Sequence, residues 1–107
     1  MEKLNEIKGK IFTTRGVGYD MEHTPEFAEE VANSIKRHFN NDFGDICKSD
    51  IALNMDALKH NLKTDRVLSR YNLSKGDIYI ISELHTITED DGDDDTVITT
   101  VMYVDEY

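Results

Sequence analysis

The chain has 107 residues, of which 38% are hydrophobic and 32% charged, and its formal net charge is −10. This length suits one domain (1–107) with one hydrophobic core, and the negative charge argues against direct binding to DNA, RNA or anionic membranes. No apolar run approaches the roughly 20 residues of a membrane span, and the first ten residues lack a secretory pattern. Cys47 is the only cysteine, so no disulfide can form within this chain. We therefore expect a cytoplasmic protein.

In the first half of the chain, some segments predict their secondary structure clearly and others only weakly. Residues 9–15 (GKIFTTR) are rich in β-branched and aromatic side chains and predict a strand. The glycine-containing segment 16–24 is expected to be a loop. Thr24 as N-cap and Pro25 as first helical residue then predict a helix that extends to Phe39. Its apolar residues recur every four positions and indicate one core-facing stripe: Phe27, Val31, Ile35 and Phe39.

A second helix is predicted after the Asn-, Asp- and Gly-rich segment 40–45. It should begin near Ser49 and extend through the sequence DIALNMDALKHN. Its apolar face is expected to comprise Ile51, Met55, Leu58 and Leu62. Cys47 is expected to be buried behind this helix.

From Arg66 onward the hydrophobic period changes from helical to two, which is typical of strands. The predicted strands are 66–73, 77–87 and 96–104. A tight turn at Asp91-Gly92 would join the last two strands into a hairpin. That turn predicts a register in which Tyr79 lies opposite Val104, Ile81 opposite Met102 and His85 opposite Ile98.

The elements together predict an α+β fold. The order is β-α-α-β-β-β, and the expected architecture is a four-stranded antiparallel sheet with two helices on one face. A long acidic hairpin would join the third and fourth strands.

The tip of that hairpin, TEDDGDDDT, carries six carboxylates within seven positions. A calcium-binding EF-hand loop would need ligands at the positions of Ile87 and Ile98, so no such motif is present. Three interpretations stay open: a solvated turn that discourages edge association, a loose site for divalent cations, or an arm that presents negative charge to a partner. The candidate partner-binding residues are Glu89, Asp90, Asp91, Asp93, Asp94 and Asp95.

Other motifs for chemistry are incomplete. Gly16 and Gly18 follow a predicted strand, but Met21 stands where a dinucleotide-binding loop needs its third glycine. The four histidines are scattered and do not predict a zinc site. Glu83 and His85 could pair on one strand, yet no nucleophile accompanies them. We therefore predict no catalytic residues, no resident metal and no cofactor.

Several stretches resemble a family of proteins of about a hundred residues that phages, plasmids and conjugative elements carry. The resemblance covers Gly9 to Tyr107 and is strongest in GKIFTTRGV, FGDICKSD, LNMDALK, RVLSRY, IYIISEL and TTVMYVDEY. Such proteins are often labelled plasmid-related protein or subunit M of a type I restriction endonuclease. A chain this short, without a cofactor-binding glycine loop, does not fit a methyltransferase subunit. The acidic connection between the last two strands is longer here than in that family.

The resemblance implies a mobile genetic element, and small acidic proteins in that setting are often inhibitors of host defence. The hypothesis is a non-enzymatic anti-CRISPR or anti-restriction protein that imitates nucleic acid. Its partner would be a host defence nuclease or another nucleic-acid-binding protein, and Tyr79 and Tyr103 would hold the base of the acidic arm. The alternative is an accessory module that binds a divalent cation or a small ligand. The sequence leaves open whether the protein is a monomer or a dimer.

Overall fold

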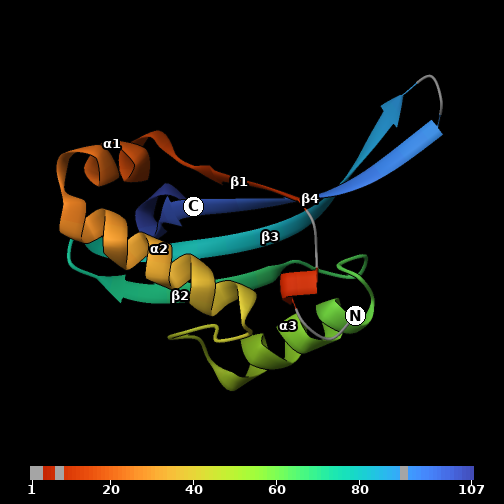
Figure 1. Ribbon diagram of the computed structural model, residues 1–107. Coiled ribbons are helices and arrows are strands. Elements are labelled where there is room, and N and C mark those ends of the chain that lie inside the picture. Colours follow the sequence, from red (N-terminus) through yellow and green to blue (C-terminus); the bar gives the residue numbers. More distant parts are fainter. Residues whose placement is uncertain (1–3, 7–8, 90–91) are drawn as a thin grey trace.

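A computed structural model describes residues 4–6, 9–89 and 92–107, with the backbone alone over 86–89 and 92–94 (Figure 1). The elements in chain order are η1 (Leu4–Glu6), β1 (Gly9–Thr13), α1 (Arg15–His23), α2 (Pro25–Phe39), α3 (Lys48–Lys59), β2 (Val67–Leu73), β3 (Gly76–Glu89), β4 (Gly92–Tyr103) and η2 (Val104–Glu106). The described part therefore contains three α-helices and four strands, which confirms the α+β class.

The four strands form one mixed sheet in the order β1-β4-β3-β2. The pairs β2–β3 and β3–β4 are antiparallel as predicted, whereas β1 lies parallel to β4, with Phe12 beside Thr100. The prediction of a fully antiparallel sheet is therefore wrong. Parallel neighbours need a long crossover connection, and here all three helices and two strands separate β1 from β4 in the chain. Local sequence patterns do not encode the direction in which such a crossover returns.

The segment predicted as a loop after β1 is the helix α1. Glycine disfavours helices by about 1 kcal/mol relative to alanine, which explains the prediction. The packing of α1 overrides this preference, because Val17 is fully buried. A β-carbon on Gly16 would lie 3.1 Å from a carboxylate oxygen of Glu106, and one on Gly18 would lie 3.1 Å from the Thr13 hydroxyl. These glycines therefore allow close contacts around α1 rather than unusual backbone angles.

The helix α2 spans Pro25–Phe39 and follows Thr24, so the predicted element and its start are confirmed. Its buried stripe is Phe27, Val31, Ser34 and His38, while Ile35 and Phe39 are only partly buried. A strict four-residue spacing drifts about 40° around a helix at each step, because one turn has about 3.6 residues. The real stripe therefore alternates steps of four and three, and it brings two polar residues into the core.

The helix α3 is rotated relative to its predicted orientation. Leu58 and the following Leu62 are buried as expected, but Ile51 is 40% exposed and Met55 is 42% exposed. The buried face instead includes the polar Asn54. Cys47, at the start of α3, is also exposed rather than buried.

The hairpin of β3 and β4 pairs in a register two residues away from the predicted one. Tyr79 lies opposite Met102, Ile81 opposite Thr100 and His85 opposite Thr96. Gly92 pairs with Glu89, so it belongs to β4 and not to a turn; its predicted turn partner Asp91 lies outside the described residues. Because side chains alternate with a period of two, a shift of two residues leaves every residue on its predicted face of the sheet.

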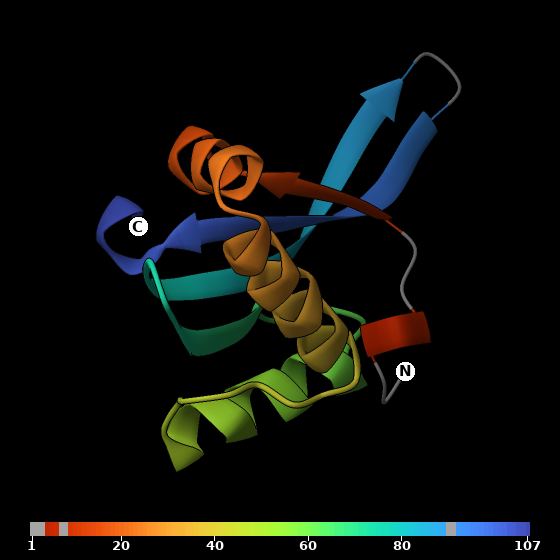
Figure 2. The same cartoon turned by 60° about the vertical axis from the view of Figure 1, so that its left-hand side comes forward.

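All three helices lie on the same side of the sheet, and α2 crosses it diagonally (Figures 1 and 2). Two apolar clusters fill the space between the layers. The first comprises Leu4, Phe43, Ala57, Leu58, Leu62, Val67 and Val97. The second comprises Val17, Phe27, Val31, Tyr71, Ile78, Ile80 and Val101.

A group of buried polar side chains lies between the two apolar clusters. His38 of α2 has Nδ1 2.6 Å from Ser69 Oγ of β2 and Nε2 2.9 Å from Ser82 Oγ of β3. Ser82 Oγ also lies 2.7 Å from the Thr99 hydroxyl of β4. A neutral imidazole carries one N–H and one lone pair, and both are used here. This hydroxyl–imidazole cluster (His38, Ser69, Ser82 and Thr99) ties α2 to three strands.

Acid should destabilise the fold through His38. Burial lowers the pKa of His38 from 6.5 to about 3, because the charged imidazolium would lose its hydration. The unfolded state therefore binds more protons than the folded state between these two values, and stability falls as the pH drops below 6.5. At about 1.4 kcal/mol per pKa unit, the loss is about 2 kcal/mol at pH 5.

Urea unfolding at pH 7 and pH 5 measures this loss, with His38→Gln as the variant that keeps a polar side chain but does not titrate. We expect the pH dependence to shrink in His38→Gln by about the same 2 kcal/mol. His60 is exposed, so His60→Gln serves as the matched control and should keep the wild-type dependence. Equal pH dependence in all three proteins would contradict the assignment.

Candidate partner-binding arm

The hairpin of β3 and β4 extends well beyond the rest of the sheet. Strand β2 pairs with β3 only as far as Ser82, and β1 pairs with β4 only from Val97. Residues 83–89 and 92–96 therefore form a two-stranded arm, which projects away from the body in both ribbon views (Figures 1 and 2). Seven residues of β-strand span about 20 Å.

The arm is the most acidic part of the chain. Residues 83–95 hold seven of the 22 acidic residues and none of the 12 lysines and arginines. This segment therefore carries most of the net charge of −10. Such a concentration of one sign creates a strong local potential that weakens with added salt.

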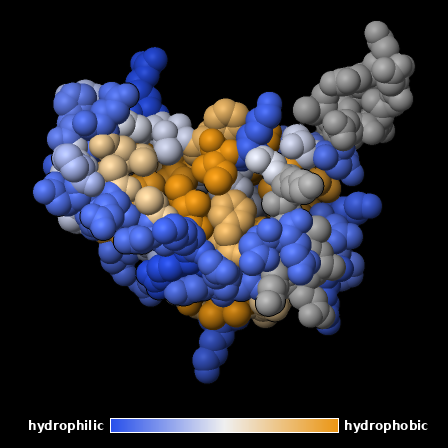
Figure 3. Space-filling model, in the orientation of Figure 1, coloured by the Kyte–Doolittle hydropathy of each residue, from blue (hydrophilic) through white to orange (hydrophobic). Residues whose placement is uncertain are grey.

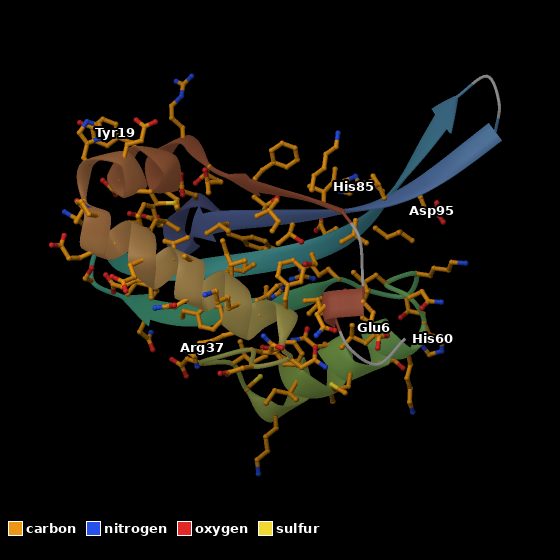
Figure 4. All side chains as sticks on the ribbon, in the orientation of Figure 1. Glu6, Tyr19, Arg37, His60, His85 and Asp95 are labelled. Carbon is orange, nitrogen blue, oxygen red and sulfur yellow. The ribbon has the colours of Figure 1, made fainter. Side chains whose placement is uncertain are left out.

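The structure places part of the predicted site on this arm. Glu89, Asp93 and Asp94 lie on its strands, Asp95 is exposed near its base, and Asp90 and Asp91 lie outside the described residues. Figure 4 shows Asp95 and His85 close to where the arm leaves the body.

The possible pair of Glu83 and His85 forms at the base of the arm. His85 Nε2 lies 3.6 Å from a carboxylate oxygen of Glu83, and both side chains are about half exposed. Exposed pairs of this kind contribute little to stability. No nucleophile accompanies them, so this pair has no evident chemistry.

The base of the arm is held by the body of the protein. Val97 belongs to the first apolar cluster and Leu84 packs against it, and the bonded pair Ser82 and Thr99 belongs to the hydroxyl–imidazole cluster. The arm therefore starts directly after a firmly packed section of the sheet. Sequence patterns identified the acidic residues but not this support, because the support depends on where β1 and β2 stop pairing.

The tyrosines predicted to hold the arm lie at the other end of the sheet. Tyr103 pairs with Ile78, and its hydroxyl donates a hydrogen bond to Asp20 of α1. The ring of Tyr79 contacts the ring of Tyr107, with centroids 5.6 Å apart. Tyr103 bonds to α1 and Tyr79 contacts the C-terminal Tyr107, so the predicted role of both tyrosines at the base of the arm is wrong.

The edge of the sheet at β2 is closed by hydrogen bonds. The side chain of Asn54 in α3 donates to the carbonyl of Leu68 at 2.7 Å and accepts from its N–H at 3.0 Å. At Arg70, the N–H donates to Phe43 and the carbonyl accepts from Asp45. Asn54 therefore acts as a short substitute for a neighbouring strand.

Gly44 is required for this closure. Its φ is +73°, and a β-carbon would lie 2.1 Å from the carbonyl oxygen of Arg70. The chain can therefore approach β2 this closely only at a glycine.

The described residues offer little other chemistry. A surface hollow of about 460 Å³ lies at the end of the sheet that carries Tyr103 and is lined partly by Asp20, Arg70, Lys75 and Asp77. Within residues 4–6, 9–89 and 92–107, no three His, Cys, Asp or Glu residues are grouped to hold a metal ion. Over the same residues, no helix is long and apolar enough to cross a bilayer.

Comparisons with known proteins gave no assignment. A scan against models of protein families, a search of curated proteins and a search of solved structures each found no significant match.

Removing the amide of Asn54 should open the β2 edge. Asn54→Ala leaves the N–H and carbonyl of Leu68 without these bonds, and we expect a loss of roughly 2–4 kcal/mol in the free energy of unfolding. Urea unfolding measures this loss. Asn33 is exposed on α2, so Asn33→Ala is the matched control and should change stability little. A similar small effect in both variants would show that Asn54 does not close the edge.

Proposed function

We propose that this protein is a non-enzymatic inhibitor that uses its acidic arm to occupy a basic, nucleic-acid-binding groove of a bacterial defence protein. The observation that supports this proposal is the two-stranded arm, residues 83–89 and 92–96, with seven acidic residues and no lysine or arginine over 83–95. The targets that fit are nucleases of CRISPR or restriction systems, because their grooves are built to receive a polyanion.

The charge density of the arm supports imitation of nucleic acid. Duplex DNA carries one negative charge per about 1.7 Å of helix axis, and a basic groove gains affinity by neutralising that charge. Six carboxylates within the seven sequence positions 89–95 approach this density. A two-stranded ribbon is narrow enough to enter the major groove of DNA, which is about 12 Å wide, so a protein groove that receives a whole duplex has room for such a ribbon.

The attachment of the arm supports a binding role over solubility alone. Solubility requires only scattered charge, whereas this arm is held at its base by the buried pair Ser82 and Thr99 and by packing at Leu84. A firmly held base reduces the conformational freedom that the arm would lose on binding. The resemblance to a family carried by mobile elements supplies the biological setting of the proposal.

A charge-matched pair of variants tests the proposal. The triple change of Asp93, Asp94 and Asp95 to Asn neutralises the arm, and the triple change of Glu22, Glu26 and Glu29 to Gln removes the same charge from exposed positions of α1 and α2. The readout is plasmid transformation into bacteria that carry an active CRISPR nuclease or restriction enzyme, with and without each protein.

We expect the wild type and the helix variant to protect the plasmid, and the arm variant to lose protection. With a purified nuclease, the association rate of the wild type should fall about tenfold or more from low to physiological salt. Equal protection by both variants would contradict the role of the arm. Micromolar binding of Ca²⁺ in calorimetry, together with full protection by the arm variant, would favour a cation-binding module instead.

A further inference from the structure

The two edge strands of the sheet, β2 and β1, differ in what lies beside them. Asn54 and the segment 43–45 close the β2 edge, whereas no described strand pairs with the outer edge of β1. Ile11 is 48% exposed and Phe12 is 50% exposed on this strand. Figure 3 shows hydrophobic surface in this region, between α1 and the arm. An open, apolar edge is a template for pairing with another strand.

The backbone of β1 presents regularly spaced bonding groups to solvent. Thr14 N–H donates to the carbonyl of Val101, at the point where β1 ends. Because bonding groups alternate along a strand, Phe12 also points its N–H and carbonyl toward β4, and Ile11 and Thr13 point theirs outward. By the same alternation Gly9 points outward.

We propose that β1 pairs with β1 of a second copy of this chain, antiparallel and centred on Ile11, to form a symmetric dimer with a continuous eight-stranded sheet. In this register every outward-pointing residue of β1 has a bonding partner. Ile11 faces Ile11 of the second copy, and Gly9 faces Thr13 of the second copy. It also places Phe12 of one copy opposite Lys10 of the other, so that the lysine stem covers the exposed ring. The strand is thus complementary to itself, as a two-fold interface requires.

Charge favours a second copy over an unrelated strand. In this register Thr13 of the second copy faces Gly9, which pairs with Val97 where the arm joins the body of the sheet. Arg15 of the second copy, an exposed arginine two residues after Thr13, therefore lies at the end of the interface from which the acidic arm extends. The dimer would display two arms, and it does not depend on what the arms bind.

A dimer built on a five-residue strand buries little area, so we expect association that depends on concentration. Analytical ultracentrifugation of the full chain should show the mass rise from 12.3 kDa toward twice that value as concentration increases. A constant monomer mass up to millimolar concentration would overturn the proposal and leave the edge for a strand of another protein.

Two exposed isoleucines provide a matched pair of variants. Ile11→Lys brings two positive charges together at the two-fold axis and should weaken dimerisation by about a hundredfold or more, since like charges on facing strands repel. Ile51 on α3 is exposed to a similar extent, at 40%, and Ile51→Lys should leave the mass unchanged. Dimerisation that persists in Ile11→Lys, or that is lost in Ile51→Lys alone, would place the interface elsewhere.

A cysteine at the centre of the register gives a test that does not depend on weakening the dimer. In a Cys47→Ser background, Ile11→Cys should form a disulfide between copies on mild oxidation, because facing residues of a bonded antiparallel pair have Cα atoms about 5.5 Å apart. Thr13→Cys would face Gly9 of the other copy and should not cross-link to itself. Cross-linking of both variants to the same extent, or of neither, would overturn this register.

Discussion

A neutral imidazole in the middle of the core connects the helical layer to the sheet. His38 bonds to hydroxyls on β2 and β3, and the hydroxyl on β3 bonds in turn to Thr99 of β4. Apolar packing alone would let α2 slide along the sheet, because hydrophobic contacts are not directional. Hydrogen bonds to β2 and β3, extended to β4 through Ser82, specify one position, and this polar cluster also separates the two apolar clusters.

The arm depends on this cluster. Ser82 is the last residue of β3 that pairs with β2, and Thr99 lies only two residues beyond the start of β1 pairing at Val97. The most constrained section of the sheet is therefore next to the section with no lateral neighbours. Mutual repulsion among the carboxylates opposes pairing within the arm, and a fixed base offsets part of that repulsion by holding the two strands in register.

The sequence predicts features that depend on residues close together in the chain. It does not predict features that depend on residues far apart in the chain. The helix α2 was predicted from Thr24, Pro25 and its own apolar spacing, and the acidic residues of the arm were evident directly. The burial of His38 was not predictable, because its partners Ser69 and Ser82 are 31 and 44 residues away. The direction of β1 was predicted wrongly, and the limits of the arm were not predicted, for the same reason: both are set by contacts between distant segments.

Gly9 is the first residue of β1 and pairs with Val97, where the arm joins the body of the sheet. A β-carbon at this position would lie 2.0 Å from the carbonyl oxygen of Val97, so β1 can meet β4 there only through a glycine. All five residues of β1 are exposed, which means that backbone hydrogen bonds rather than burial hold the strand in place. Each such bond contributes only about 1 kcal/mol, and the two strands are more than eighty residues apart in the chain. The strand that limits the length of the arm is therefore also the least firmly attached strand of the sheet, and additional bonds along its outer edge would stabilise both.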